Sequence, residues 1–331
     1  MSDERYIVVL MGGISPEREI SLQSGKAVTN ALTNDNNNVI KIIVNDDIVN
    51  ELDNYKIDVA FIALHGHFGE DGGIQEVLES KGITYTGSGI KASKLAMNKV
   101  ESKDVFRRNN IPTPDYFTAS TQQNISEITD GIKSLKLPLI TKPVSNGSSI
   151  GISIVKEYDG IKDAIEHTGR YGREILVEEC IEGRELAVSV LNEKALPVIE
   201  IKTATGIYDY DAKYKSDKTQ YNILTSGDES SEATLPYDVY ERVQELAVRA
   251  HSSLGCRTFS RVDMILNKDD EIYVLEVNTI PGFTERSLLP KAAAAANISF
   301  SELCNVIVNA ACKRTPIPEP VTRAGISKIK I

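Results

Sequence analysis

The sequence has little positive charge and no long apolar run, and each of these features argues against particular classes of function. Among its 331 residues, 37 lysines and arginines are outnumbered by 47 aspartates and glutamates, which gives a formal net charge of −10. We therefore expect no broad surface for nucleic acid or anionic membrane, and any anionic ligand must be held by a few local cations. No run of about 18 apolar residues occurs, so we expect no membrane span.

Cysteine is also scarce, and its spacing does not match a metal site. Only Cys304 and Cys312 form even a loose pair. We interpret the four cysteines as reduced thiols in the core of a cytoplasmic protein: Cys180, Cys256, Cys304 and Cys312. The G-x-G-x-x-G spacing of dinucleotide-binding loops is missing as well, which argues against an NAD-dependent oxidoreductase.

The first hundred residues alternate strand-like and helix-like patterns. We expect strands at 6–11, 39–44, 58–64 and 83–87, and helices that begin near Pro16, Gly73 and Lys91. The first apolar run stops at Gly12, so we interpret it as a strand rather than a signal peptide. This alternation predicts a parallel sheet with helices on both faces.

The pattern changes after 111–117, where two prolines mark a linker. An α+β arrangement is expected from there, with strands at 137–143, 150–155, 174–180, 184–191, 257–266 and 271–277, and helices at 158–168, 237–253 and 299–312. Residues 202–227 are polar, contain four tyrosines and lack apolar periodicity, so we interpret them as a structureless functional lid. Residues 314–331 contain three prolines and are expected to be a mobile tail.

The strand-like stretch 273-YVLEVNTIPGF-283 carries polar side chains where apolar ones are expected. Glu276 and Asn278 lie two residues apart, so on a strand they point to one face. Arg261 and Asp263 repeat this spacing on the preceding strand, and a hairpin would place Asp263 beside Glu276. Two carboxylates and one amide suit Mg²⁺ that also binds substrate phosphates. A cross-strand salt-bridge cluster is an equally good interpretation of the same residues.

A second candidate is 141-TKPVSNGSSIG-151, in which Lys142 ends a strand and small residues follow. Small residues let backbone N–H groups approach phosphate oxygens closely, and Lys142 adds a point charge. The stretch is not a Walker A loop, because no Gly-Lys-Ser/Thr leads into a helix. A Gly-Ser hairpin without a ligand is the alternative interpretation.

A third candidate, 12-GGISPEREISL-22, directly follows the first strand. Ser15 and Pro16 are typical of a helix start, which places Glu17 in the first helical turn. Glu17 either stabilises the helix through its dipole or holds a ligand ammonium at the carboxyl end of the sheet.

The fourth candidate, 63-ALHGHFGEDGG-73, contains the only pair of histidines, His65 and His67. A zinc site needs at least a third protein ligand, and none is within reach by spacing. We therefore favour His65 as a polar or phosphate-side contact.

Seven blocks of the sequence, in this order, resemble the D-alanine–D-alanine ligases of the ATP-grasp superfamily. They are GGISPEREISLQSG, ALHGHFGEDGGIQ, YTGSGIKASKLAMNK, TKPVSNGSSIG, YDYDAKY, RVDMIL and LEVNTIPGFTERSL. The resemblance runs from about residue 6 to residue 310 and leaves out only the tail. Seven blocks in the family's own order make a chance match implausible.

The resemblance implies an ATP-grasp fold of mixed α/β and α+β class. An N-terminal parallel α/β domain, 1–98, would be followed by two α+β domains that clamp ATP. These would be a central domain, 99–184, and a C-terminal domain, 185–313, which contains the predicted lid.

The implied reaction joins two D-alanine molecules to D-alanyl-D-alanine for peptidoglycan precursor synthesis. ATP would phosphorylate the first D-alanine, and the amine of the second would attack the D-alanyl phosphate. The family also implies two Mg²⁺ or Mn²⁺ ions and a homodimer formed through the N-terminal domain. The implied metal ligands are Asp263, Glu276 and Asn278.

The resemblance also implies contacts to the nucleotide. Lys99 and Lys142 would contact the phosphates, and Glu185 would take the ribose hydroxyls. The chain departs from the family at Glu179, where relatives often have lysine, so we expect the backbone there to read adenine. The full nucleotide set is Lys99, Lys142, Ser148, Ser149, Glu178, Glu179, Ile181, Glu185 and Lys213.

For the amino-acid substrates, the resemblance implies that Glu17 binds the first ammonium and forms a hydrogen-bonded triad with Ser148 and Tyr214. Arg261 and the backbone N–H of Gly282 would form an oxyanion hole. The implied substrate contacts also include His65, Tyr208, Ser287 and Leu288.

Two other functions compete with this interpretation. A D-alanine–D-lactate or D-alanine–D-serine ligase would keep the fold, but such relatives tend to replace the pair Lys213-Tyr214, which is present here. A nucleotide-binding protein without catalysis would be expected to lose a metal ligand or a member of the triad. Every such position is filled.

Overall fold

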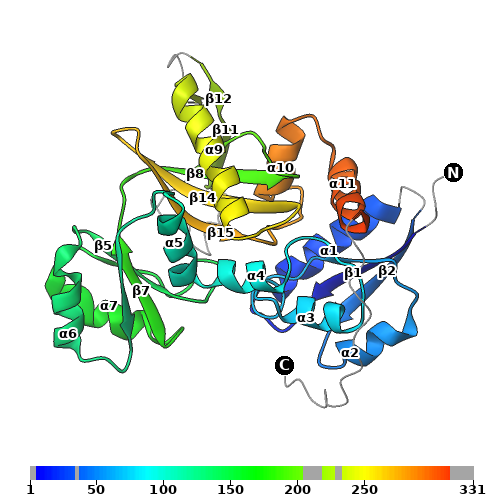
Figure 1. Cartoon of the computed structure of the whole chain (residues 1–331), viewed down its shortest axis with the longest axis horizontal. Coiled ribbons are helices and arrows are strands. Elements are labelled where there is room, and N and C mark those ends of the chain that lie inside the picture. The colour runs from blue at the N-terminus through cyan, green and yellow to red at the C-terminus, as the bar shows by residue number, and fades with distance from the viewer. Residues whose placement is uncertain (1–4, 34–36, 204–217, 228–232, 314–331) are drawn as a thin grey trace.

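The computed structural model describes residues 5–33, 37–203, 218–227 and 233–313. Figure 1 shows three lobes, with the N-terminal strands on the right, the central segment on the left and the later strands above and between them. The predicted tail 314–331 lies outside the described residues.

The N-terminal lobe is built on a parallel sheet, as predicted. Its strands are β1 (Tyr6–Gly12), β2 (Asn38–Val44) and β3 (Val59–Ile62), in the order β2-β1-β3. Its helices are α1 (Arg18–Thr33), α2 (Ile48–Glu51) and α3 (Gly73–Ser80), with the short 3-10 helix η1 (Leu52–Asn54). The strand predicted at 83–87 is wrong. Only Tyr85 pairs, with Ala60, because Gly82 and Gly87 turn the chain on either side with φ of 66° and 83°.

The central lobe contains a four-stranded antiparallel sheet. Its order is β4-β7-β5-β6, formed by β4 (Tyr116–Ser120), β5 (Leu139–Pro143), β6 (Ser153–Val155) and β7 (Glu174–Glu179). Its helical segments are α6 (Ile125–Gly131), η2 (Ile132–Ser134), η3 (Tyr158–Gly160) and α7 (Ile161–Thr168). The lobe has an apolar core of its own, which includes Ile132, Leu139 and Val177.

The third sheet is larger, and it corrects the prediction for 202–227. Its main path is β11-β10-β8-β14-β15, with β9 paired to β8. The strands are β8 (Gly183–Leu191), β9 (Lys194–Ala195), β10 (Ile199–Lys202), β11 (Gln220–Ile223), β14 (Phe259–Asn267) and β15 (Ile272–Asn278). Both ends of the predicted lid are therefore regular, because β10 pairs with β11 from Ile199 to Lys202. The short strands β12 (Thr225–Ser226) and β13 (Thr234–Leu235) form a separate parallel pair.

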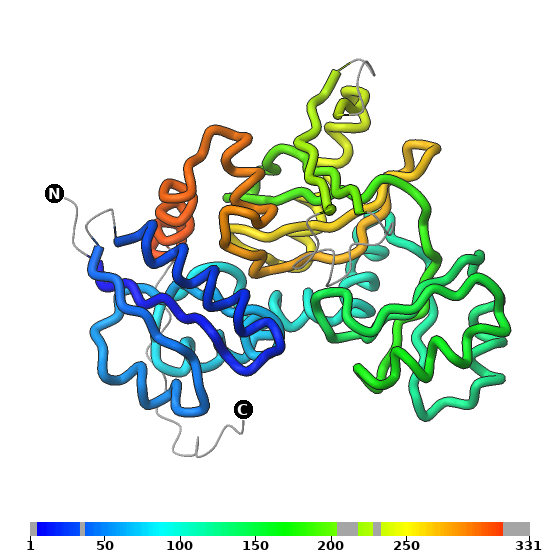
Figure 2. Tube along the Cα trace, turned by 180° about the vertical axis from the view of Figure 1, so that it is seen from behind, coloured from blue at the N-terminus to red at the C-terminus, as the bar shows by residue number. Residues whose placement is uncertain are grey.

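Helices connect and cover these lobes. The pair α4 (Ile90–Met97) and α5 (Lys99–Arg108) leads from the N-terminal lobe to the central one, and α9 (Tyr237–Ser253) covers the large sheet. After β15 come α10 (Leu288–Ala295) and α11 (Phe300–Cys312). Figures 1 and 2 show α11 returning to lie beside α1.

Burial of the cysteines differs from the expectation. All four are free thiols, but only Cys256 and Cys304 are buried, whereas Cys180 is half-buried and Cys312 is exposed. Burial raises the pKa of Cys256 to about 12. Among the described residues, no helix has the length and apolar character that a membrane crossing requires.

Candidate active site

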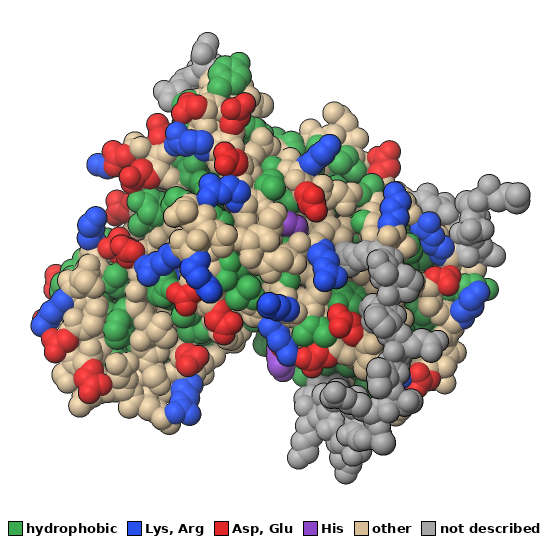
Figure 3. All heavy atoms as spheres, viewed as in Figure 1, with side chains coloured by type: hydrophobic (Ala, Val, Ile, Leu, Met, Phe, Trp, Pro, Cys, Tyr) green, Lys and Arg blue, Asp and Glu red, His purple; other side chains and the backbone are tan. Residues whose placement is uncertain are grey.

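Two adjoining cavities lie where the lobes meet. The first is lined by the N-terminal lobe and the large sheet, the second by the central lobe and the large sheet. Lys99 and Glu276 line both cavities, so they mark the boundary between them. Figure 3 shows the molecule hollowed between the lobes, with basic and acidic side chains interspersed on this face.

The predicted hairpin of β14 and β15 is confirmed, and so is its register. Asp263 pairs with Glu276, and Arg261 pairs with Asn278. The register shifts directly after Asp263, which leaves Leu275 without a partner on β14. This bulge interrupts the alternation of β15, and Leu275 and Glu276 both line the second cavity.

Cations already accompany both carboxylates of this hairpin. The Arg261 Nε and NH2 groups donate to the two Asp263 carboxylate oxygens, each at 2.7 Å, in a bidentate pair. The Lys99 Nζ lies 3.4 Å from Glu276 Oε2. These pairs differ from the cross-strand cluster considered from the sequence, because Arg261 and Asp263 lie on the same strand and the cation beside Glu276 is Lys99 of α5.

Glu17 and Ser148 meet across the first cavity, as the resemblance implies. The Ser148 hydroxyl donates to Glu17 Oε1, and Glu17 is buried. The helix α1 begins at Arg18, two residues after Pro16, and the Ser15 hydroxyl accepts the Glu17 N–H in the turn that leads into it, as expected of a capping serine. Gly66 is required beside this carboxylate, since a Cβ there would lie 2.6 Å from Glu17 Oε2.

His65 is buried in a chain of polar contacts. Its Nε2 lies 3.1 Å from the Ser24 hydroxyl, and its Nδ1 lies 3.4 Å from Glu70 Oε1. The Ser24 oxygen in turn accepts the Phe283 N–H at 3.2 Å. Burial raises the pKa of Glu70, even though His65 beside it acts in the opposite direction. His67 instead points to solvent and pairs with Asp71.

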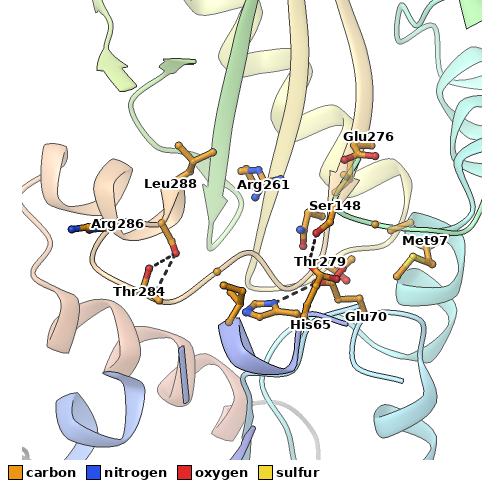
Figure 4. A pocket seen from close by; sticks show the side chains of 18 of the residues that line it. His65, Glu70, Met97, Ser148, Arg261, Glu276, Thr279, Thr284, Arg286 and Leu288 are labelled. Carbon is orange, nitrogen blue, oxygen red and sulfur yellow. Dashed lines mark hydrogen bonds and ion pairs between the residues drawn. The ribbon is translucent and has the colours of Figure 1, made fainter. Parts of the chain in front are cut away.

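The far side of the first cavity is a tight turn that leads into α10. The Ser287 hydroxyl accepts the Thr284 N–H at 3.1 Å, and a Cβ on Gly282 would lie 2.6 Å from that hydroxyl. Leu288 begins α10, so the N-terminus of this eight-residue helix faces the cavity. A helix N-terminus stabilises carboxylates. Figure 4 shows Leu288 and Thr284 on one side of the cavity and His65, Glu70 and Ser148 on the other.

The second cavity collects the residues expected around a nucleotide. It is lined by Lys99, Lys142, Ser149, Glu178, Glu179, Ile181 and Glu185. The Lys142 Nζ lies 2.6 Å from Glu178 Oε1. Two consecutive serines, Ser148 and Ser149, have φ of 56° and 53°, a left-handed conformation that is uncommon for residues other than glycine.

Glu179 lines this cavity, and one of its carboxylate oxygens has a partner outside it. Its Oε1 accepts the Lys136 N–H at 2.8 Å, on the side of β5. That the backbone rather than the Glu179 side chain contacts adenine stays a prediction.

Comparison with known proteins decides the family. The family model described as D-ala D-ala ligase C-terminus matches residues 105–309, and D-ala D-ala ligase N-terminus matches residues 47–88. The chain belongs to the D-alanine–D-alanine ligase family. A D-alanine–D-alanine ligase of Desulforamulus reducens is 42% identical over 93% of this chain and 99% of its own length. One of Geotalea uraniireducens is 43% identical over 93% and 96%.

Solved structures of ligases share the fold. The D-alanine–D-alanine ligase of Bacillus anthracis complexed with ATP has a TM-score of 0.81 at 33% identity, covering 93% of this chain and 97% of that one. The VanG D-Ala:D-Ser ligase of Enterococcus faecalis has a TM-score of 0.80 at 30% identity, covering 93% and 100%. The fold therefore does not by itself separate ligases that use D-alanine from ligases that use D-serine.

Three of the expected site residues fall outside the described structure, and four residues in or beside the two cavities were not expected from the sequence. Tyr208, Lys213 and Tyr214 lie within 204–217, which the structure does not describe. The residues missed are Glu70, Lys103, Tyr221 and Arg286. Glu70 could have been found from the sequence, because it is a carboxylate in the glycine-rich block that follows His65. No local sequence pattern points to Lys103, because its partner Glu178 lies 75 positions further along the chain.

Proposed function

We propose that this chain joins two D-alanine molecules with ATP, through a D-alanyl phosphate, to give D-alanyl-D-alanine, ADP and phosphate for peptidoglycan precursors. The observation that carries the proposal is the pair of adjoining cavities, one lined by carboxylate, hydroxyl and helix N-terminus, the other by lysines. Membership of the ligase family supplies the reaction. The segments 1–98, 99–184 and 185–313 are proposed as its domains, with ATP between the last two.

The nucleotide is assigned to the second cavity. We assign Lys99 and Lys142 to its phosphates, Glu178 and the backbone from Glu179 to Ile181 to adenine, and Glu185 to the ribose. Phosphoryl transfer needs aligned reactants and neutralised oxygens rather than covalent help from the protein. The two lysines would align the phosphates and offset part of their charge.

The donor set of the hairpin fits Mg²⁺. Asp263 and Glu276 are register partners, and Asn278 adds an amide oxygen. Within the described residues, no group of three His, Cys, Asp or Glu side chains could hold a metal. Such an incomplete cage suits Mg²⁺, which takes its remaining ligands from phosphates and water. Bound there, Mg²⁺ would neutralise phosphate oxygens, and Arg261 would be released from Asp263.

The first D-alanine is assigned to the Glu17 side of the first cavity. Glu17 would hold its ammonium, with Ser148 as its hydrogen-bonded partner and His65 nearby. A carboxylate oxygen of this D-alanine would attack the γ-phosphorus, and ADP would leave. Arg261 and the Gly282 N–H would then stabilise the oxygen that gains charge at the carbonyl.

The second D-alanine is assigned to the start of α10. The Ser287 hydroxyl and the Leu288 N–H would hold its carboxylate, which directs its amine toward the D-alanyl carbonyl carbon. Attack forms the peptide bond, phosphate leaves, and the amine loses a proton. Tyr208, Lys213 and Tyr214 retain their sequence-based assignments, because they lie outside the described residues.

Assembly and location are further parts of the proposal. We propose a homodimer through the N-terminal lobe, which carries the exposed apolar side chains Ile43, Val49 and Tyr55. We place the enzyme in the cytoplasm, where ATP is available. Light scattering of the purified chain tests the dimer, since a monomer mass at micromolar concentration would contradict it.

The deciding experiment is phosphate release from ATP and Mg²⁺, with D-alanine alone and with D-alanine plus D-lactate or D-serine. We expect phosphate release with D-alanine alone, and D-alanyl-D-alanine as the main product by mass spectrometry in every mixture. A main product that contains D-serine or D-lactate would replace the second substrate and keep the mechanism. Absence of phosphate release with all three would contradict the ligase function.

A further inference from the structure

One buried carboxylate beside the nucleotide cavity has two lysine partners rather than one. Glu178 lies on β7, and its side chain is 2% exposed. Its Oε1 lies 2.6 Å from the Lys142 Nζ, and its Oε2 lies 2.6 Å from the Lys103 Nζ. The two lysines come from different elements, since Lys142 is on β5 and Lys103 is on α5.

The two lysines differ in their access to the cavity. Lys142 lines it and is 14% exposed, whereas Lys103 does not line it and is 1% exposed. Lys103 is also held by two further acceptors, the Thr113 hydroxyl at 2.6 Å and the Pro114 carbonyl at 3.3 Å. The Lys103 ammonium thus makes two hydrogen bonds besides its ion pair with Glu178. Lys103 is therefore fixed, while Lys142 can reach a ligand.

Two partners matter because a lone buried carboxylate is costly. If Lys142 turned to a phosphate and Glu178 had no other cation, an uncompensated charge would be left in the interior. Lys103 prevents this, because it stays against Glu178 when Lys142 leaves. The two lysines together lower the pKa of Glu178 despite its burial, so the carboxylate stays ionised.

We propose that Lys103 is a positioning residue for catalysis: it serves as the fixed counter-ion of Glu178 and so releases Lys142 to the phosphates of ATP. The inference rests on the proposed assignment of the second cavity to ATP. A second contact supports the fixed position, because the Thr113 hydroxyl that accepts from Lys103 donates to the Val274 carbonyl on β15 at 2.7 Å. Lys103 thus links the two sheets that face the nucleotide.

The test compares Lys103→Met with the wild-type chain in binding ATP and adenosine, measured by displacement of a fluorescent ATP analogue. Lys103→Met keeps most of the unbranched side chain and removes its charge. Because Lys142 is then retained by Glu178, we expect ATP to bind about tenfold or more weakly, and adenosine, which has no phosphates, to change by less than about twofold. The KM for D-alanine should stay within about twofold.

The matched control is Arg107→Met, one turn later on α5, where the guanidinium pairs with Asp115 at the surface. It should leave both affinities unchanged. Equal losses for ATP and adenosine in Lys103→Met would overturn the proposal, since Lys103 would then only shape the cavity. Unchanged ATP binding would overturn it as well.

A second comparison does not depend on the folding of Lys103→Met alone. In a Glu178→Gln background no buried carboxylate is left to compensate, so adding Lys103→Met should change ATP affinity by less than about threefold. A further tenfold loss in that background would contradict the counter-ion role. The two affinity measurements need only nucleotide binding, so a wild-type chain that binds ATP without joining D-alanine would refute the proposed function and leave this inference standing.

Discussion

At the scale of single residues, Glu276 connects the two cavities. It faces Asp263 across the hairpin, lies 3.4 Å from the Lys99 Nζ, and lines both spaces. Removal of its charge would take one proposed metal ligand away and leave Lys99 without this partner, while the strand register would persist.

We therefore expect Glu276→Gln to lower turnover by at least about 100-fold, as for a lost ligand of a catalytic metal. Mg²⁺-dependent ATP binding should weaken in parallel, as measured by titration with and without the metal. Glu271→Gln, an exposed change just before the same strand, is the control. Near-normal turnover of Glu276→Gln would remove the argument for a metal site on this hairpin.

His251 is a residue whose charge state matters for stability rather than catalysis. It is buried on α9, with its Nδ1 2.7 Å from the Ser260 hydroxyl, and burial lowers its pKa to about 4. An unfolded histidine has a pKa of about 6.5. At a pH between these two pKa values, His251 is therefore protonated in the unfolded chain and neutral in the folded chain. This contribution to stability is present at neutral pH and is lost as the pH falls below about 6.5.

We expect His251 to account for about 2 kcal/mol of the free energy of unfolding lost between pH 7 and pH 5. His251→Asn, which keeps a polar atom near Ser260, should make unfolding in urea less dependent on pH over that range. The exposed His167 on α7 provides the control, His167→Asn. If His251→Asn and wild type lose the same stability, another group is responsible.

At the scale of elements, the cap of α5 connects local stability with the site. Asn98 precedes the helix, and its side-chain oxygen accepts the N–H groups of Val100 and Glu101, both at 3.1 Å. The helix then begins with Lys99, whose Nζ donates to the Asn146 carbonyl in the serine-rich loop at 2.7 Å. One cap therefore supports a residue that lines both cavities.

Asn98→Ala should lower the free energy of unfolding in urea by about 1 kcal/mol, the usual cost of losing such a cap. The KM for ATP should rise at the same time, because the cap no longer holds the first turn of α5, in which Lys99 lies. Asn98→Ser keeps an acceptor and should restore most of both. A KM that rises equally in the alanine and serine variants would show that the cap is not the cause.

The elements also show what the sequence could predict and what it could not. The hairpin was predictable because Arg261, Asp263 and Glu276, Asn278 repeat one spacing on two strands. The strand β11 was missed because 220-QYNI-223 is mostly exposed or half-buried and carries no alternation, and its pairing with β10 alone defines it. Pairing between distant segments also produced the Lys103–Glu178 contact, which no local pattern encodes.

At the scale of the whole molecule, the seven sequence blocks predicted the fold, but the boundaries of the apolar cores differ from those of the three proposed domains. One core is confined to the central lobe. Another joins Ile7 and Phe61 of the N-terminal lobe with Phe259 of β14 and Ile307 of α11. Phe283 lies edge-on to both Phe61 and Phe259, at 5.1 and 5.4 Å between ring centroids. The turn that carries Gly282 is thus anchored in a core shared by two lobes.

The return of α11 to the first lobe has a consequence for synthesis on the ribosome. Leu303, Ile307 and Val308 are buried in the same core as β1 and α1, yet they are translated about three hundred residues after Ile7. Part of the apolar surface of β1 and α1 therefore stays uncovered during synthesis until α11 has emerged from the ribosome. The N-terminal lobe is the first to be made and the last to be completed.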